Sequence, residues 1–583
     1  MIRLEIVDGS LQISVAGAII LVAPKDSCAI DVLALYDDVP HIFIYNKYLG
    51  NSTVIFYKPL ADCEDDTGTP FTVNTFITFA EQNLGFNGGS TPPPSTSPFE
   101  YNGNNTGIEP VLGTNQASGT YATIGGGCCN TSSNRYSTIG GGFCNTASGE
   151  NSSIFGGFCN VTNSRHSIIG GGHRNVIQSP TNECCSLGVT IGGGIGHNSS
   201  GGSFNATTGA ITGIITCCNA GRLSTIGGGL RNCSLGVYTT ISGGQCNSAL
   251  SNWGTVGGGF SNVSCYLSTV GGGCSNTASG NRSTISGGCL NTANSGSFIG
   301  GGGCNTSSGF YSTISGGRFN TASGYCSTIG GGQCNIASAC TSTIGGGQNN
   351  SVSAVNSSIF GGCLNITNSR HSIIAGGHRN VIQSPTNECC SLGVTIGGGI
   401  GHNSSGGSFN TTTGAITGTI TCCNAGRLST IGGGFRNIGT GGFSFIGGGC
   451  QNVASSACSI VVGGVSNTAS AQESTVGGGR SNTASGCLSI VGGGASNIAS
   501  GICSVISGGW NNRASGANSA VLGGRENTTN SCADAMIVGS CITANRACTT
   551  FVNNLSIIDI PTSSAGLPTG AVWRNGTVLE IVP

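Results

Sequence analysis

A short repeat runs through most of this chain and limits the folds that it can adopt. From about residue 120 to residue 545, an isoleucine or valine followed by glycines recurs, usually every 15 residues and sometimes every 14. The consensus of one repeat is S-T-I-G-G-G-x-x-N-T-A-S-G-x-x. A fixed short period over hundreds of residues is typical of a solenoid, in which each repeat forms one coil that stacks on its neighbours.

One coil of this length holds two short strands and two turns, because a strand residue spans only about 3.3 Å. We expect Ser-Thr-Ile to form one strand with the isoleucine inward, and the glycines to form a tight turn with positive φ. The x-x-Asn-Thr-Ala segment then returns as the second strand, with the alanine inward and the asparagine in an amide ladder at the turn. The predicted structural ladders include Ile124, Ile139 and Ile154, and Asn130, Asn145 and Asn160.

The apolar core of such a coil is small. One isoleucine and one alanine bury too little area, at about 25 cal/mol per Å², to offset the roughly 1–2 kcal/mol per residue that ordering the backbone costs. This imbalance favours a core shared by three chains around one axis, so we expect a homotrimer. A stack of about 25 coils at about 4.8 Å per coil would form a rod on the order of 120 Å long.

Composition divides the chain into four parts. Residues 1–100 contain all three lysines and 12 of the 21 acidic residues, and their β-branched and aromatic runs are typical of strands. A proline-rich stretch follows, which is typical of a semi-rigid spacer. The expected fold class is all-β, with an N-terminal β-rich attachment domain (1–88), a Pro/Ser/Gly linker (89–110), a long parallel β-solenoid shaft (111–545) and a small C-terminal β-hairpin tip (546–583).

A duplicated cassette interrupts the regular period. Ser152–Asn232 recurs almost unchanged at Ser357–Asn437, and each copy contains two spacings longer than 15 residues. Insertions in a solenoid form surface loops, where binding residues concentrate. The predicted insertions are 176–187 and 196–223 in the first copy, and 381–392 and 401–428 in the second.

Charge and hydropathy disfavour several partners. The formal net charge is −1 and only 7% of residues are charged, whereas nucleic acid and anionic lipid attract clustered basic residues. The longest apolar run, Val15–Ala23, is about half as long as a membrane-spanning helix. We therefore expect no nucleic acid, no membrane insertion and no targeting signal, with folding in a reducing cytosol.

The repeat S-T-I-G-G-G-x-x-N-T-A-S-G resembles the head repeat of YadA-like trimeric autotransporter adhesins, also called Hep/Hag repeats. That family has a period near 14 and an S-V-A-I-G-x-x-S-x-A core. The resemblance covers roughly residues 110–545 and implies a trimeric, left-handed parallel β-roll. The secretion signal, heptad stalk and C-terminal membrane anchor of the family have no counterpart in this sequence.

The segment Ala565–Val582 resembles a second group of proteins. Its G-L-P-T-G-A-V-W-R-N-G-T-V-L-E-I sequence is similar to the G-L-P-x-G-x-x-W/Y-x-x-G-x-L-x-I ending of many phage and virus fibre or tail proteins, and its Asn-Gly pair predicts a hairpin. Together the two resemblances imply a non-enzymatic virion tail fibre, made in the host cytoplasm. Its N-terminal domain would bind other virion or tail proteins, and the projecting fibre would adhere to a host-surface glycan or protein.

Two other functions stay open at this point. A cell-surface trimeric adhesin, exported by an unrecognised route, would use the same repeat. An ice-binding β-solenoid is the other alternative, because stacked Ser-Thr pairs would form a flat face of hydroxyl groups.

Cysteines occupy repeated positions in the coils, and their count of 31 is odd. Cys129, Cys144 and Cys159 each lie five residues after the inward isoleucine of their coil. We favour small buried residues that fill a structural ladder, since free cysteine packs as a small hydrophobe. Disulfides between neighbouring coils or chains, formed after release from the cell, are the alternative.

The duplicated cassette also contains six of the seven histidines. A threefold axis would multiply one histidine into three metal ligands, but no H-x-H motif occurs, so we favour polar surface residues and expect no metal. Arginines of the cassette and the tip are further candidates for glycan or acidic groups. The predicted receptor-binding residues are Arg165, His166, His173, Arg174, His197, Arg222, Arg370, His371, His378, Arg379, His402, Arg427, Trp573 and Arg574.

Acidic residues are too scattered to predict catalysis. Glycan cleavage usually requires two carboxylates a few ångström apart, and only eight acids lie between residues 101 and 560. The acidic cluster around Asp62 lacks the alternating oxygen spacing of a calcium loop. We expect no catalytic residue, no cofactor and no enzymatic activity.

Overall fold

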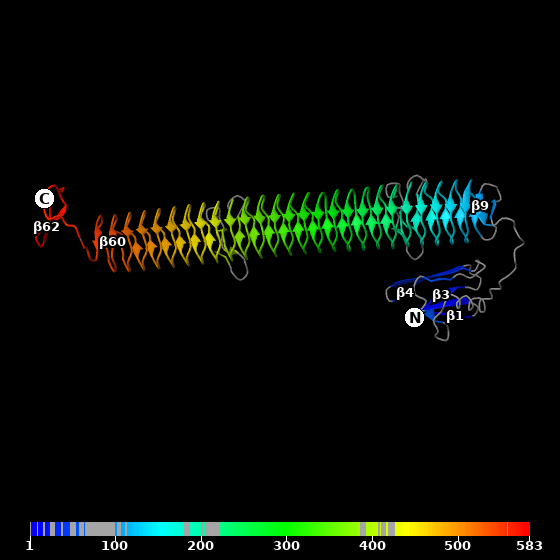
Figure 1. The fold of residues 1–583 in the computed structure, drawn as a ribbon, viewed down its shortest axis with the longest axis horizontal. Helices are drawn as coiled ribbons and strands as arrows, with labels where there is room; N and C mark the ends of the chain where they lie inside the picture. Colours follow the sequence, from blue (N-terminus) through cyan, green and yellow to red (C-terminus); the bar gives the residue numbers. More distant parts are fainter. Residues whose placement is uncertain are drawn as a thin grey trace. The chain divides into compact units, whose positions relative to one another are not determined.

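A computed structural model of the chain has β-strands as its only regular elements among the described residues, and no described helix has the length and apolar character needed to cross a membrane. The strands form a parallel β-solenoid of about 25 turns with coils of roughly 15 residues (Figure 1). The predicted all-β parallel solenoid is therefore confirmed. Before residue 114 the structure describes strands only, and from 114 to 582 it omits 180–186, 200–202, 205–210, 213–220, 385–391, 406–407, 410–415, 418–425 and 557.

The chain divides into two compact units, Met1–Ser264 and Cys265–Pro583. The first unit begins with two small sets of strands, in which β1–β2–β3 and β4–β5–β6 pair antiparallel and β7 lies parallel to β1. Their bounds are β1 (Ile2–Val7), β2 (Ser10–Val15), β3 (Ala18–Ala23), β4 (Ala29–Tyr36), β5 (Val39–Asn46), β6 (Val54–Phe56) and β7 (Cys63–Glu64).

Two strands of the predicted linker belong to the solenoid itself. β8 (Phe99–Tyr101) and β9 (Gly107–Pro110) form an antiparallel pair. β9 then pairs in parallel with β11 (Ala122–Ile124), the first coil strand of this sheet. The segment that precedes the shaft therefore covers the edge of its first coil, which would otherwise expose unpaired backbone groups.

Each regular coil contributes one short strand to each of two parallel sheets. In the first unit, β11, β13 (Thr138–Ile139), β15 (Ser153–Ile154), β17 (Ile168–Ile169), β19 (Thr190–Ile191), β22 (Thr225–Ile226), β24 (Thr240–Ile241) and β26 (Thr255–Val256) belong to one sheet. The opposite sheet contains β10 (Gln116–Ala117), β12 (Thr131–Ser132), β14 (Thr146–Ala147), β16 (Val161–Thr162) and β18 (Val176–Ile177), and then β23 (Cys233–Ser234), β25 (Ser248–Ala249) and β27 (Val263–Ser264).

The second unit repeats this arrangement. One sheet runs from β28 (Thr269–Val270) to β59 (Ala520–Val521) and ends with β60 (Met536–Val538) and β61 (Thr550–Val552). The other runs from β29 (Thr277–Ala278) to β43 (Val381–Ile382), and again from β48 (Ile438–Gly439) to β58 (Arg513–Ala514). At the C-terminus, β62 (Val572–Asn575) and β63 (Val578–Ile581) form an antiparallel hairpin.

Register is fixed because identical positions of successive coils pair. Ile124 lies opposite Ile139, and Ile139 opposite Ile154, in a column that is completely buried. Ala147 of the other sheet is equally buried. These side chains are buried within a single chain, so the isoleucine and alanine columns do not form a core shared between chains.

Hydrogen bonds between coils provide stability that the small apolar core alone does not. The backbone N–H groups of Thr138, Gly140 and Thr146 each donate to a carbonyl oxygen of the following coil, at 2.8–2.9 Å. The same pattern continues from coil to coil within each unit. Because each bond here satisfies a backbone group that the fold removes from water, the stack is stabilised without a large apolar core.

The Ser-Thr pair does not form the paired hydroxyl face expected of an ice-binding solenoid. Neighbouring strand residues point to opposite faces, so Ser137 is completely buried and its hydroxyl donates to the Asn134 carbonyl at 2.7 Å. Thr138 alone faces outward from that strand. A coil therefore offers at most one hydroxyl from this pair, and some coils offer none, since Ile168 and Phe298 occupy the outward position of theirs.

Candidate functional site: the asparagine ladder and the duplicated cassette

Asparagines hold the coils together at the glycine turn. The backbone N–H of Asn145 donates to Oδ1 of Asn130 at 3.0 Å, and its own Nδ2 donates to the carbonyls of Gly141 and Gly157 at 3.1 and 2.9 Å. Asn160 repeats these bonds in the next coil. All three asparagines are completely buried, so each one ties its own turn to the coils on either side.

Two histidines take the place of asparagine in this ladder. His197 lies six residues after Ile191, the ladder position, and its backbone N–H donates to Oδ1 of Asn175 at 3.0 Å. Its Nδ1 accepts the backbone N–H of Asn232 at 3.0 Å. His402 makes the same two bonds in the second copy, at 2.9 and 3.1 Å.

Both ladder histidines are completely buried, which corrects their prediction as receptor-binding residues. Burial lowers the pKa of His197 and of His402 to about 4, so both rings are neutral at physiological pH. Because Nδ1 of His197 accepts a hydrogen bond, the ring proton lies on Nε2. Nε2 is buried and makes no hydrogen bond of normal geometry. The nearby carbonyls of Gly193 and Gly229 raise the pKa of the ring, but by less than burial lowers it.

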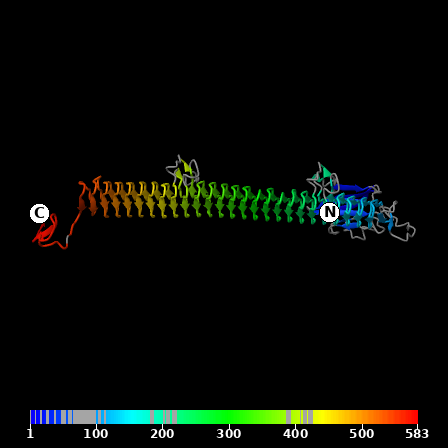
Figure 2. The same cartoon turned by 90° about the horizontal axis from the view of Figure 1, so that it is seen from above.

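The larger insert of each copy leaves the coil a few residues after this histidine. In the first copy, the backbone N–H of Gly221 donates to the Ser199 carbonyl at 3.1 Å, so residues 196–199 and 221–223 belong to the coil. Gly426 and Ser404 make the same bond in the second copy. The described strands of the inserts are antiparallel pairs beside their coils (Figure 2), namely β20 (Ser203–Phe204) with β21 (Ile211–Thr212) and β45 (Ser408–Phe409) with β46 (Ile416–Thr417).

The other predicted receptor-binding residues lie at several depths. Buried among them is His173, whose ring centroid lies 5.2 Å from that of Phe158. Exposed side chains are those of His166, Arg222, His371, Arg427 and Arg574, and half-buried side chains are those of Arg165, Arg174, Arg370, His378, Arg379 and Trp573.

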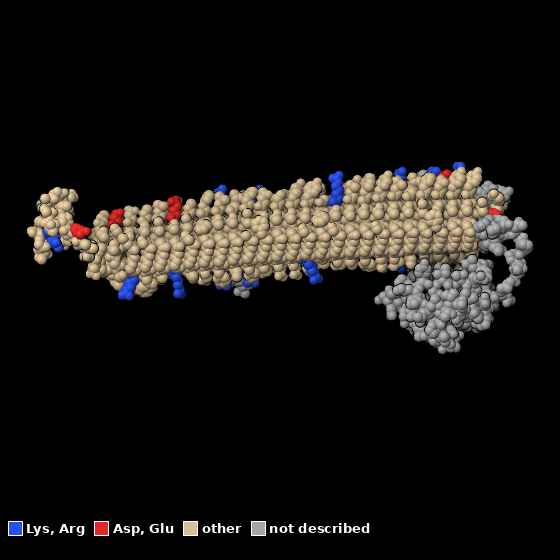
Figure 3. All heavy atoms as spheres, viewed as in Figure 1, with Lys and Arg blue, Asp and Glu red and all other residues tan. Residues whose placement is uncertain are grey.

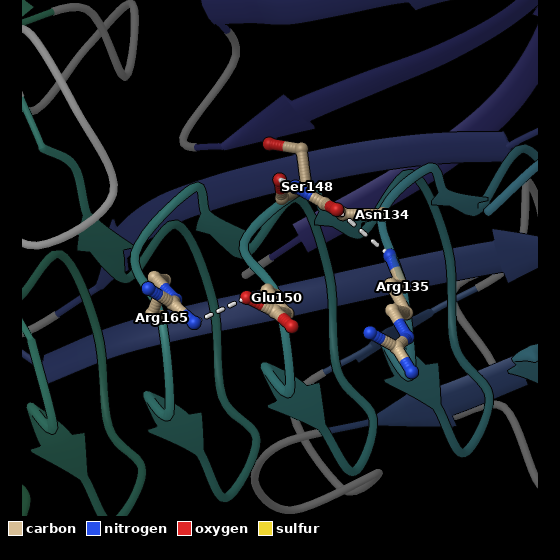
Figure 4. A network of polar contacts seen from close by, with 5 residues as sticks. All are labelled: Asn134, Arg135, Ser148, Glu150 and Arg165. Atoms are coloured by element: carbon tan, nitrogen blue, oxygen red, sulfur yellow. Dashed lines mark hydrogen bonds and ion pairs between the residues drawn. The ribbon is translucent and has the colours of Figure 1, made fainter. Parts of the chain in front are cut away.

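A short row of charges occupies one position of three successive coils. Arg165 forms an ion pair with Glu150, with 2.5 Å between Nη2 and Oε2, and Arg135 lies one coil away on the other side (Figure 4). Asn134 positions this turn, since its Oδ1 accepts the Arg135 backbone N–H at 2.8 Å and its Nδ2 donates to the Ser148 carbonyl at 2.9 Å. Elsewhere on the face shown in Figure 3, charged side chains are few and widely spaced.

Exposed aromatic side chains stack between coils, which the sequence reasoning missed. Tyr121 and Tyr136 stack with ring centroids 5.1 Å apart, and Tyr238 and Trp253 at 5.9 Å. In the second unit, Phe310, Tyr311 and Tyr325 form an exposed cluster. Their signal is present in the sequence, since aromatic residues recur 15 residues apart at one coil position.

The predicted buried cysteine ladder is wrong. Cys129, Cys144 and Cys159 are only half-buried, and they lie in the left-handed region with φ of 60°, 53° and 50°. Among the described cysteines, Cys128 alone is buried. The cysteines at this position therefore line the surface of a turn, while isoleucine, alanine, serine and asparagine fill the interior.

Comparison with known proteins adds no family to this description. No protein-family model matches the chain, and no curated protein matches it significantly. Within the part of the chain that the structure describes, no group of three or more histidine, cysteine or acidic side chains has an arrangement that holds a metal ion.

Proposed function

We propose that this protein is the structural shaft of a virion fibre, which projects from the particle and presents binding segments to a host surface. The observation that carries the proposal is the coil-to-coil ladder of asparagine and backbone hydrogen bonds. Such a ladder supports a long scaffold whose outward side chains are not needed for folding, so they are available for binding. The resemblance of Ala565–Val582 to fibre and tail endings supports the viral setting.

The two cassette copies are the proposed adhesive segments. Each presents a large insert from the same position of its coil, with exposed arginine and histidine side chains nearby, at Arg222 and His166 in the first copy. Stacked exposed aromatics such as Tyr238 and Trp253 provide faces on which sugar rings pack. A host-surface glycan is therefore the favoured ligand, and the N-terminal strands are the proposed attachment end.

The resemblance to YadA-like heads also supports a homotrimer, with one change of geometry. Since the inward side chains are buried within one chain, contact between chains would use outward apolar residues such as Phe298 and Phe445. The native mass of the purified chain in reductant tests this: a species of three times 57.6 kDa supports the trimer, and a stable monomer contradicts it.

Adhesion is tested with a variant that keeps the shaft intact. Removing residues 200–220 and 405–425 joins Ser199 to Gly221 and Ser404 to Gly426, pairs already linked by a hydrogen bond. The repaired coils are 14 residues long, a spacing that the chain already uses from Val256 to Val270. We expect the full chain to bind glycans on an array or whole host cells, and the variant to bind at least tenfold more weakly with an unchanged oligomeric state.

The outcomes separate the functions. Unchanged binding by the double-deletion variant would show that the inserts do not carry adhesion. Presence of the chain in purified virus particles supports the fibre, whereas its presence in a cell envelope would instead support the surface adhesin.

A further inference from the structure

Four cysteine thiols meet at the start of the solenoid, in three successive coils of the first unit. Cys129, Cys144 and Cys159 occupy the same position of their coils, and Cys128 precedes the first of them. The backbone N–H of Cys144 donates to the Cys128 carbonyl at 3.0 Å, and that of Cys159 to the Phe143 carbonyl at 2.9 Å. These bonds hold the three cysteines in register on one surface turn.

The sulfur atoms lie close together. Sγ of Cys128 and Sγ of Cys129 are 3.1 Å apart, and the Cys144 thiol interacts with the thiols of both Cys129 and Cys159. Equivalent positions of neighbouring coils are about 4.8 Å apart. A disulfide usually joins Cα atoms about 4.4–6.8 Å apart, so the spacing between coils lies within the range for such a bond.

We propose that this stack is an oxidation site at which Cys144 forms an exchangeable disulfide with either Cys129 or Cys159. A low-molecular-weight disulfide such as oxidised glutathione is the oxidant. A thiolate of Cys129 or Cys159 attacks it, which releases one glutathione thiolate and leaves a mixed disulfide. Cys144 then attacks the protein sulfur of that mixed disulfide and releases the second glutathione. Two protein thiols are thereby oxidised and one glutathione disulfide is reduced to two thiols.

Three stacked thiols differ from a simple pair, because one thiol always remains. The remaining cysteine lies beside the new bond and can attack it, so the disulfide can move along the stack. Burial raises the pKa of Cys144 to about 11. Closure by Cys144 should therefore be slow at neutral pH and should accelerate about tenfold per pH unit below that value.

Peptide mapping distinguishes the two positions of the bond. Arg135 and Arg165 are consecutive basic residues, so trypsin separates Cys129 from Cys144 but leaves Cys144 and Cys159 in one peptide, residues 136–165. After incubation of the full chain with oxidised glutathione, thiol blocking and digestion, we expect both species: residues 48–135 linked to 136–165, since the Lys58–Pro59 bond resists trypsin, and 136–165 with an internal disulfide.

Serine variants identify the partners without disturbing the turn, because serine already occupies this position with φ of 53° at Ser261. Cys129→Ser should remove the link between peptides and keep the internal disulfide, and Cys159→Ser should do the reverse. Cys144→Ser should abolish both. Cys246→Ser is the matched control, since the neighbouring coils have Arg231 and Ser261 at that position.

Two results would overturn the proposal. One is a wild-type chain that carries only glutathione adducts on these cysteines, with no closed disulfide at any pH up to 9. The other is a Cys144→Ser chain that still forms a disulfide between Cys129 and Cys159, which would show that Cys144 is not the shared partner.

Discussion

The two copies of the cassette have nearly the same sequence, and their interiors are built alike. His197 and His402 accept the backbone N–H of the next ladder asparagine at 3.0 and 3.1 Å. The serine hydroxyls beside the inserts, Ser199 with Ser224 and Ser404 with Ser429, are 2.9 and 2.7 Å apart. Inward positions therefore repeat faithfully, because each side chain there is held by the coils above and below it.

The outward positions of the two copies differ because their neighbours in the stack differ. His173 packs against Phe158, whereas the equivalent His378 is half-buried beside Cys363. Arg165 has Glu150 as an ion-pair partner one coil away. The equivalent residue just before the second copy is a valine, Val355. The outward residues at one coil position, which form a column along the stack, can thus differ from coil to coil while the fold of each coil stays the same.

We expect the largest loss of stability from substitution of the third glycine of the turn, and an equal loss in the two copies. Gly172 and Gly377 have φ of 91°, and an added Cβ would lie 2.1 Å from the Gly194 carbonyl oxygen and 2.0 Å from that of Gly399. Gly172→Ala and Gly377→Ala should each destabilise their coil by about 4 kcal/mol or more, because backbone atoms must move. Hydrogen exchange of the affected coils measures this.

The second glycine of the turn provides the control. An added Cβ at Gly156 or Gly376 meets no atom within 4 Å, so Gly156→Ala and Gly376→Ala should leave exchange nearly unchanged. Equal protection loss in the third-glycine and second-glycine variants would show that steric conflict at the turn does not govern coil stability.

Acid should loosen both copies by a similar amount. A folded-state pKa of about 4 for His197 and His402 lies below the usual value of 6.5. The folded state then binds fewer protons than the unfolded state, so stability is full above about pH 6.5 and is lost as the pH falls towards 4. The loss is about 3 kcal/mol per histidine, measured by hydrogen exchange of residues 189–234 and 394–439 between pH 7.5 and 4.5.

One substitution should separate the copies in this experiment. His197→Asn restores the usual ladder residue between Asn175 and Asn232, and should remove the acid response of the first copy while the second keeps its own. If the first copy still opens in acid as before, a group other than His197 is responsible.

The residues that point inward could be predicted from the sequence. The non-glycine residues with positive φ, and the burial of His197, were not predicted. The period places Ile124 and Asn130 correctly, because inward residues repeat most strictly. Positive φ was assigned to glycines alone, since a Cβ disfavours that region. Cys129 and Tyr136 nevertheless have φ of 60° and 57°, because hydrogen bonds between coils fix the turn whatever the side chain. His197 was misjudged as a surface residue, although its spacing from Ile191 already marked the ladder position.

The ion pair should contribute much less than the ladder. Glu150 and Arg165 keep 25% and 37% of their side-chain surface exposed, and exposed pairs contribute about 0.2–1 kcal/mol. Glu150→Gln should therefore destabilise the first copy by about 0.5 kcal/mol, and 0.5 M salt should reduce the difference.

The reverse change can be made beside the second copy. Val355→Glu places an acid one coil from Arg370 and should increase stability by a similar amount. No change in hydrogen exchange in either variant, at low salt, would show that this row of charges has no effect on stability.

The smallest expected effect concerns the outer faces of His173 and His378. The Phe158 ring shields His173, whereas Cys363 leaves His378 half-exposed, so diethyl pyrocarbonate should modify His378 a few times faster at pH 7. Phe158→Cys should raise the rate at His173 to that of His378, and Cys363→Phe should lower the rate at His378. The exposed His166 and His371 serve as internal references, since both substitutions lie outside their column. If neither substitution changes the modification rate of its histidine, the backbone of the coil, and not the neighbouring side chain, shields the ring. The exposure of an outward residue would then depend on the coil beneath it and not on the outward residue of the next coil.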